Sequence, residues 1–175
     1  MRAAGCPTVA RLRHEADECG GRLAAHGARL LWTDADRESC ERRRTLLNRQ
    51  LSQARRYNDI RAMCKRSLAE FDGVNVATCL GVLMRMSCVG REHVALHRQL
   101  HARLLSVLHE QTRTSEKDAG VLSTTAWAMA KSQCCDAALL SRISELSCQQ
   151  IEHFEARNLA NLAWSHGSLK TTVSE

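Results

Sequence analysis

Basic residues gather in one stretch of this 175-residue chain, where they could bind an anionic polymer. Between Arg42 and Arg66 stand nine Lys or Arg residues and one acid, which gives this stretch a charge of +8. The whole chain carries +6, so the remainder carries −2. Such a local excess favours a nucleic acid or a charged membrane surface as partner. The simplest alternative is a solvated helix face that aids solubility. Our candidate phosphate-binding residues within it are Arg55, Arg56 and Arg61.

A second set of polar residues is spaced so that it could contact a ligand along aligned helices. Thr78 and Arg85 are seven residues apart, as are Thr124 and Lys131, and Asn161 occupies the threonine position of a third segment. Offsets of four and seven place side chains on one line of a helix. Thr and Asn can hydrogen-bond a base edge, whereas Arg and Lys can meet phosphate. An ordinary solvent-facing stripe is the alternative. The middle positions of the three lines are Val82, Ala128 and Ser165.

Three histidines, His93, His97 and His101, recur at four-residue intervals, a spacing that can hold zinc. No carboxylate or cysteine is placed to complete the ligand set, and leucines occupy the adjacent face. We therefore interpret the row as the polar flank of an amphipathic helix and predict no metal site.

Nine cysteines are present, but none forms a Cys-x-x-Cys pair, which argues against zinc ribbons and disulfide frameworks. We expect Cys79 and Cys148 to be small buried hydrophobes. An odd number of thiols favours a reducing compartment. No Gly-rich phosphate loop, catalytic triad or carboxylate pair is present. We predict no enzymatic activity, no cofactor and no small-molecule substrate.

Two similar segments stand 37 residues apart, from Leu122 to Ala130 and from Leu159 to Gly167, and a related one begins at Val76, 46 residues before Leu122. Self-similarity at such a period is typical of stacked helical repeats. The partner residues keep the register, because Ile60, Leu68 and Phe71 precede Val76 by the same 16, 8 and 5 residues as Ile143, Ile151 and Phe154 precede Leu159. The extra nine residues are assigned to an inserted loop at Gln111–Asp118.

The repeat places Leu80, Ala126 and Ala163 at equivalent positions, all predicted to be buried. Trp127 and Trp164 are also equivalent. We expect both to fill the seams between repeats, and a base-stacking platform is the alternative.

Helical periodicity extends over most of the chain, which has a single proline and no strand-like alternation. We predict an all-α protein, an α-solenoid of stacked hairpins with a period of about 37 residues. No apolar run approaches the roughly 18 residues of a membrane helix. The expected helices cover about 37–54, 57–71, 75–86, 92–111, 119–132, 136–150 and 156–168. The expected regions are a poorly defined N-terminal segment with weak targeting character at 1–36, the helical-repeat domain at 37–170 and a tail at 171–175.

The stretches Asn48–Ile60, Phe71–Thr78 and Asn158–Trp164 resemble organellar RNA-binding helical-repeat proteins of protists and algae. The last stretch is similar to their recurrent Leu-Ala-Asn-x-x-Trp helix. The period is similar to that of the heptatricopeptide class, with the octotricopeptide class and the helical subunits of RNA-editing substrate-binding complexes as close relatives, many of them associated with a RAP domain. The resemblance covers about residues 45–168.

This resemblance implies an α-solenoid that binds single-stranded RNA in a mitochondrion or, alternatively, a chloroplast. Its role would lie in RNA processing, stability, translation or ribosome assembly, together with other ribonucleoprotein subunits. Carried over by position, the RNA-facing residues are Thr78, Arg85, Thr124, Lys131 and Asn161. The alternative function is a protein–protein scaffold within a ribonucleoprotein complex that reads no bases.

Overall fold

The computed structural model describes residues 33–86, 90–110 and 116–173. These residues contain helices and no strand, so the prediction of an all-α protein is confirmed. None of the described helices is long and apolar enough to cross a membrane. The chain divides into two compact units, residues 1–43 and 44–175, and each is described by itself. Residues 1–32, most of the N-terminal segment for which the sequence suggests weak targeting character, lie outside the described part of the chain.

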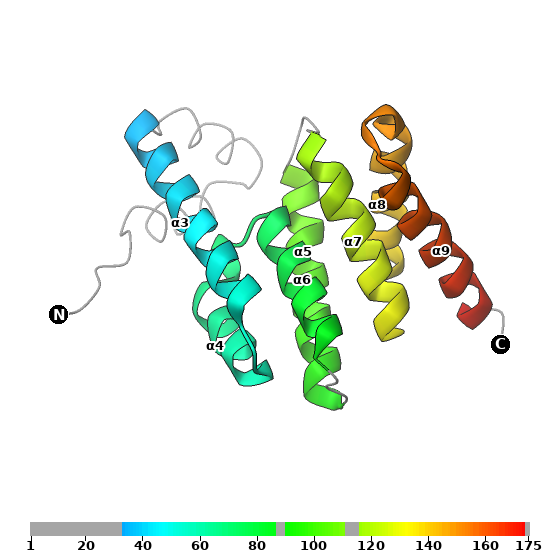
Figure 1. Cartoon of the computed structure of the whole chain (residues 1–175), viewed down its shortest axis with the longest axis horizontal. Coiled ribbons are helices and arrows are strands. Elements are labelled where there is room, and N and C mark those ends of the chain that lie inside the picture. The colour runs from blue at the N-terminus through cyan, green and yellow to red at the C-terminus, as the bar shows by residue number, and fades with distance from the viewer. Residues whose placement is uncertain (1–32, 87–89, 111–115, 174–175) are drawn as a thin grey trace, which may run out of the picture. The chain divides into compact units, whose positions relative to one another are not determined.

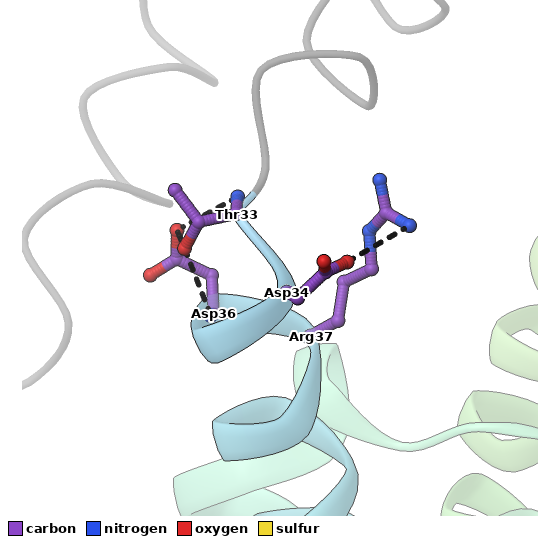
Figure 2. Close-up of polar contacts among 4 residues, drawn as sticks. All are labelled: Thr33, Asp34, Asp36 and Arg37. Carbon is purple, nitrogen blue, oxygen red and sulfur yellow. Dashed lines mark hydrogen bonds and ion pairs between the residues drawn. The ribbon is translucent and has the colours of Figure 1, made fainter.

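Helix α3 spans Asp34–Gln53 and begins three residues earlier than the sequence predicts. Its start is fixed by a reciprocal capping arrangement, shown in Figure 2. The Asp36 backbone N–H donates to Oγ1 of Thr33 at 3.2 Å, and the Thr33 backbone N–H donates to Oδ2 of Asp36 at 3.1 Å. Because Thr33 donates to this carboxylate, the pKa of Asp36 is lowered. Arg37 also pairs with Asp34, at 3.6 Å. These contacts satisfy N–H groups that a helix start otherwise leaves free.

Helix α4 spans Tyr57–Ser67, the short 3₁₀ helix η1 spans Leu68–Glu70, and α5 spans Gly73–Arg85. Gly73 opens α5, although glycine is more common just after the end of a helix. Asp72 is the N-cap, because its Oδ1 accepts the Asn75 backbone N–H at 2.8 Å while the Asn75 amide oxygen accepts the Asp72 N–H. The prediction that the helix begins at Asn75 was therefore two residues late.

The remaining helices are α6 at Arg91–Glu110, α7 at Glu116–Ser132, α8 at Ala137–Gln149 and α9 at Ala156–Val173, with the 3₁₀ helix η2 at Ile151–His153. Their bounds agree with the predicted helices to within about five residues. Residues 116–118 were expected in an inserted loop but belong to the first turn of α7. The rest of that loop, 111–115, lies outside the described residues.

Within residues 44–175 the helices form two layers. In one layer α5, α7 and α9 lie side by side, with α7 packed on both neighbours (Figure 1). In the other layer α6 packs on α8, and these helices also pack on α5 and α7 respectively. The Arg103 side chain of α6 donates to the Phe71 carbonyl, just before α5, at 2.9 Å. Within the second layer, the Arg142 side chain of α8 donates to the Leu108 carbonyl of α6 at 3.4 Å.

Local structure recurs at the two helix junctions that the sequence aligns. Ile60 and Ile143 are buried in α4 and α8, a 3₁₀ helix follows each of these helices, and Phe71 and Phe154 are buried just after it. Leu68 and Ile151 both begin the 3₁₀ helix, although Ile151 is exposed. The matched spacings therefore correspond to matched backbone structure.

The predicted burial of three equivalent residues is right for two of them. Leu80 and Ala126 are fully buried, whereas Ala163 is exposed. Trp127 is half-buried against the core, but Trp164 is largely exposed rather than packed in a seam. The reason is positional: α7 covers α5 and α9 covers α7, whereas no described helix covers the outer side of α9.

The capping box of α5 gives a direct test of the local account. Asp72→Ala removes the acceptor for the Asn75 N–H, so it should cost about 1 kcal/mol of unfolding free energy. For a chain of this size that corresponds to a decrease in Tm of roughly 2–4 °C. Asp72→Asn keeps an acceptor oxygen and should melt close to the parent protein. Equal melting of both variants, measured by circular dichroism, would show that Asp72 does not cap α5.

Candidate nucleic-acid interface

The basic block predicted from sequence falls on α3 and α4. Arg42 and Arg43 belong to the separately described residues 1–43, where Arg42 pairs with Glu38 at 3.1 Å. Within residues 44–66 of the block, the exposed cations for which no carboxylate partner is seen among the described residues are Arg49, Arg55, Lys65 and Arg66.

Two of the three candidate arginines already form ion pairs with carboxylate side chains. Arg56, the N-cap of α4, makes two hydrogen bonds to Asp59 at 3.2 Å, and these bonds raise the pKa of its guanidinium. Arg61 of α4 pairs with Glu92 of α6 at 3.1 Å. All four side chains are substantially exposed, so both pairs are weak surface pairs that a polyanion could replace. Arg55 is the candidate whose charge is uncompensated.

Cations from α4 and α6 come together around two adjoining depressions. One, of about 170 Å³, lies between the helices and is lined by Arg61, Lys65 and Glu92 among others. The second, of about 460 Å³, lies at the start of α6 and includes Arg91 and Arg98. Ala95 lines both depressions, so they adjoin at this residue. We call Arg61, Lys65, Arg91 and Arg98 the α4–α6 basic patch; its lining includes one acid, Glu92.

Sequence reasoning missed half of this patch. Arg91 and Arg98 lie outside the basic block, in a stretch with no obvious excess of charge. They line a depression that shares Ala95 with the one lined by Lys65, an arrangement that a count of charges along the chain does not show. The i, i+7 spacing of Arg91 and Arg98 on one helix face was the available signal.

The predicted line of ligand-reading residues is interrupted. Arg85 and Lys131 are exposed, while Thr78, Thr124 and Asn161 are half-buried. The middle positions Val82, Ala128 and Ser165 are buried.

Thr124 lies in the seam between two helices. A β-carbon placed on Gly81 would be 3.8 Å from Cγ2 of Thr124, so this threonine packs against α5. The line therefore does not form one continuous accessible track. Its exposed members are the two cations, which stand near the carboxyl ends of α5 and α7.

The three histidines are not a polar flank, contrary to the sequence prediction. His97 and His101 are fully buried, and none of their four ring nitrogens has a hydrogen-bond partner among the described residues. The rings form a row, with centroids 4.6 Å apart from His93 to His97 and 5.8 Å from His97 to His101. No set of three or more His, Cys, Asp and Glu side chains in the described residues is arranged to hold a metal ion.

Burial keeps the histidine row neutral. Loss of solvation, together with the neighbouring His93 and His101, lowers the pKa of His97 to about 3. Loss of solvation lowers the pKa of His101 to about 4, although the nearby Asp136 carboxylate opposes the change. The row is therefore an uncharged part of the core near neutral pH.

One of the two cysteine predictions is right. Cys79 is buried as expected, with its Sγ 3.8 Å from that of Cys64, whereas Cys148 is exposed. The buried residues of α8 are Leu139, Ile143, Leu146 and Ser147, and Cys148, the next residue along the chain, is not among them. Adjacency in sequence to apolar residues therefore did not decide its burial.

A comparison of the chain with models of known protein families, with curated proteins and with solved structures finds no match. The chemistry of the protein must therefore be inferred from its own residues.

The histidine row predicts acid sensitivity. In the unfolded chain each histidine binds a proton near pH 6.5, whereas folded His101 and His97 do so only near pH 4 and 3. The unfolded state therefore binds more protons below pH 6.5. The free energy of unfolding should decrease there by about 1.4 kcal/mol per pH unit for each histidine.

Urea unfolding between pH 7 and pH 4.5 measures this slope. In His101→Leu the contribution of one titrating group is removed, so the slope should become shallower by about 1.4 kcal/mol per pH unit. An unchanged slope would mean that His101 is protonated equally in both states.

Proposed function

We propose that this protein binds single-stranded RNA through the α4–α6 basic patch and the adjoining exposed arginines of α3 and α4. The observation that carries the proposal is that Arg61, Lys65, Arg91 and Arg98 line two adjoining depressions whose lining includes a single acid. Lysine and arginine meet phosphates irrespective of sequence and fix the register of the strand. Few aromatic side chains accompany them, so backbone contact outweighs base stacking in this mode of binding.

The helical hairpins of residues 44–175 are proposed to be repeats of an α-solenoid with a period of about 37 residues. The recurring order of buried isoleucine, 3₁₀ helix and buried phenylalanine supports this assignment. So does the side-by-side packing of α5, α7 and α9. Each repeat in such an array contacts its neighbours, and the array offers an extended surface to a polymer.

The cellular role proposed from the sequence resemblance is organellar RNA processing, stability, translation or ribosome assembly, in a mitochondrion or alternatively a chloroplast. The second candidate function is a scaffold subunit of a ribonucleoprotein complex without base readout. The exposed apolar side chains of α9, Leu159 and Trp164, favour a protein contact there. The two functions are compatible, because the basic patch and α9 use different helices.

Charge-reversal variants test whether RNA binding depends on the position of a basic residue or only on the net charge of the protein. Lys65→Glu and Arg98→Glu should each weaken binding of every single-stranded RNA tested, because both remove a phosphate contact. Arg157→Glu, on exposed α9, makes the same change in net charge and should have a much smaller effect. Fluorescence anisotropy with labelled RNAs of several sequences measures the affinities.

Salt dependence tests the same contacts independently. Reversal of Arg55, Arg56 and Arg61 together should make the slope of log K against log salt less steep by about 2, since each contact to a single strand contributes about 0.7. Equal slopes, or equal losses in Arg157→Glu, would assign the binding to overall charge.

Two members of the predicted line, exposed Lys131 and half-buried Asn161, make a separate prediction about readout. Lys131→Ala should weaken all RNAs alike, because a backbone contact carries no sequence information. Asn161→Ala should change which RNA is preferred, because a base-edge contact discriminates. Competition between two RNAs of equal length measures the preference. A uniform loss in both variants would remove Asn161 from the reading residues.

A further inference from the structure

Helix α9 presents an exposed apolar face. Leu159 is 39% exposed and Trp164 is 49% exposed, although both are large hydrophobic side chains. Ala160, Ala163 and Gly167 are exposed beside them. Among the described side chains of α9, residues 156–169, Arg157 is the only Asp, Glu, Lys or Arg residue. The face is thus large, apolar and nearly uncharged.

The equivalent residues of the two preceding helices in the layer are covered. Leu122 and Ala126 of α7 correspond to Leu159 and Ala163 at the 37-residue offset, and both are 0% exposed. Val76 and Leu80 of α5 hold the same positions and are also fully buried. They are buried because α7 packs on α5 and α9 packs on α7. The face on α9 therefore continues an interface that the molecule already forms twice.

We propose that the outer face of α9 docks one helix of a further helical hairpin, and that this helix packs on α9 as α9 packs on α7. The partner is defined by chemistry: an amphipathic helix whose docking side is apolar or small and carries no charge. This contact goes beyond RNA binding and does not depend on it, since it uses residues outside the α4–α6 basic patch.

The seams already present specify one position of the partner helix. At the α7–α9 seam, Oγ of Ser123 donates to the Asn158 amide oxygen at 3.0 Å. The residue equivalent to Ser123 is Ala160 in α9 and Ala77 in α5, so neither offers a hydroxyl. In α7 the residue equivalent to Asn158 is Val121, which packs against Gly73, one turn before Ala77. The partner of α9 therefore carries an apolar residue where α9 has Asn158.

An extended chain tests whether the face accepts such a helix. A second copy of residues 133–169 is inserted directly after Leu169, which preserves the 37-residue offset, and the copy carries Asn158→Val. The added hairpin should be helical and should unfold with the rest in one transition, measured by circular dichroism at 222 nm. A chain that gains no helical signal, or whose added part melts separately, contradicts the proposal.

One substitution placed in two contexts supplies the matched control. In the extended chain, Ala163→Glu in the original α9 would bury a charge in the new seam and should lower Tm by at least about 5 °C. The same substitution in the inserted copy stays on an exposed face and should change Tm by less than about 2 °C, as it should in the parent chain. Equal effects at the two sites would overturn the proposal.

Sedimentation of the parent protein distinguishes the proposed occupant from a second copy of the chain. The parent should remain monomeric at micromolar concentration, because its own inward-facing helix sides are already packed. A dimer that Trp164→Glu dissociates would assign the face to self-association instead. Loss of RNA binding in the charge-reversal variants leaves these outcomes unaffected, so the two proposals fail separately.

Discussion

The close packing of α5, α7 and α9 is the constraint on which the rest of the structure depends. Small residues make it possible: a β-carbon on Gly73 would lie 3.2 Å from Cγ1 of Val121, tighter than ordinary van der Waals contact. Ala126, Ala128 and Ala130 of α7 are likewise buried. Because these helices approach closely, α6 and α8 are held side by side behind them. The position of α6 then decides which of its side chains are buried and which of its cations belong to the α4–α6 basic patch.

Helix α6 shows both consequences of this packing. The stripe of Leu96, Leu100, Leu104 and Leu108 was evident from its four-residue spacing, and all four are buried. The neighbouring stripe of histidines was misassigned as solvent-facing, because a helix packed on both α5 and α8 buries a wider arc than one stripe. Arg91 and Arg98 on another side remain exposed and complete the basic patch. One helix thus contributes to the core and to the proposed RNA surface.

Local periodicity was sufficient to predict the helices and the burial of Leu80 and Ala126, since the apolar face of a helix depends on residues close in sequence. Contacts between helices were not predictable in the same way. Thr124 was assigned to an open line, yet it packs against the Gly81 side of α5. Ala163 was assigned to a buried seam, yet its burial requires a neighbour that the described residues do not supply. Asp72 was overlooked as an N-cap because Gly73, normally a helix terminator, follows it.

We propose that RNA binds the cations of α4 and α6 and that a protein contacts the apolar residues of α9. Crosslinking of purified protein to a labelled single-stranded RNA, followed by mass spectrometric mapping of the crosslinked peptides, tests this assignment most directly. We predict that the crosslinks concentrate in residues 49–66 and 91–98. Crosslinks confined to α9, or no crosslinks at an RNA concentration that saturates binding, would contradict it.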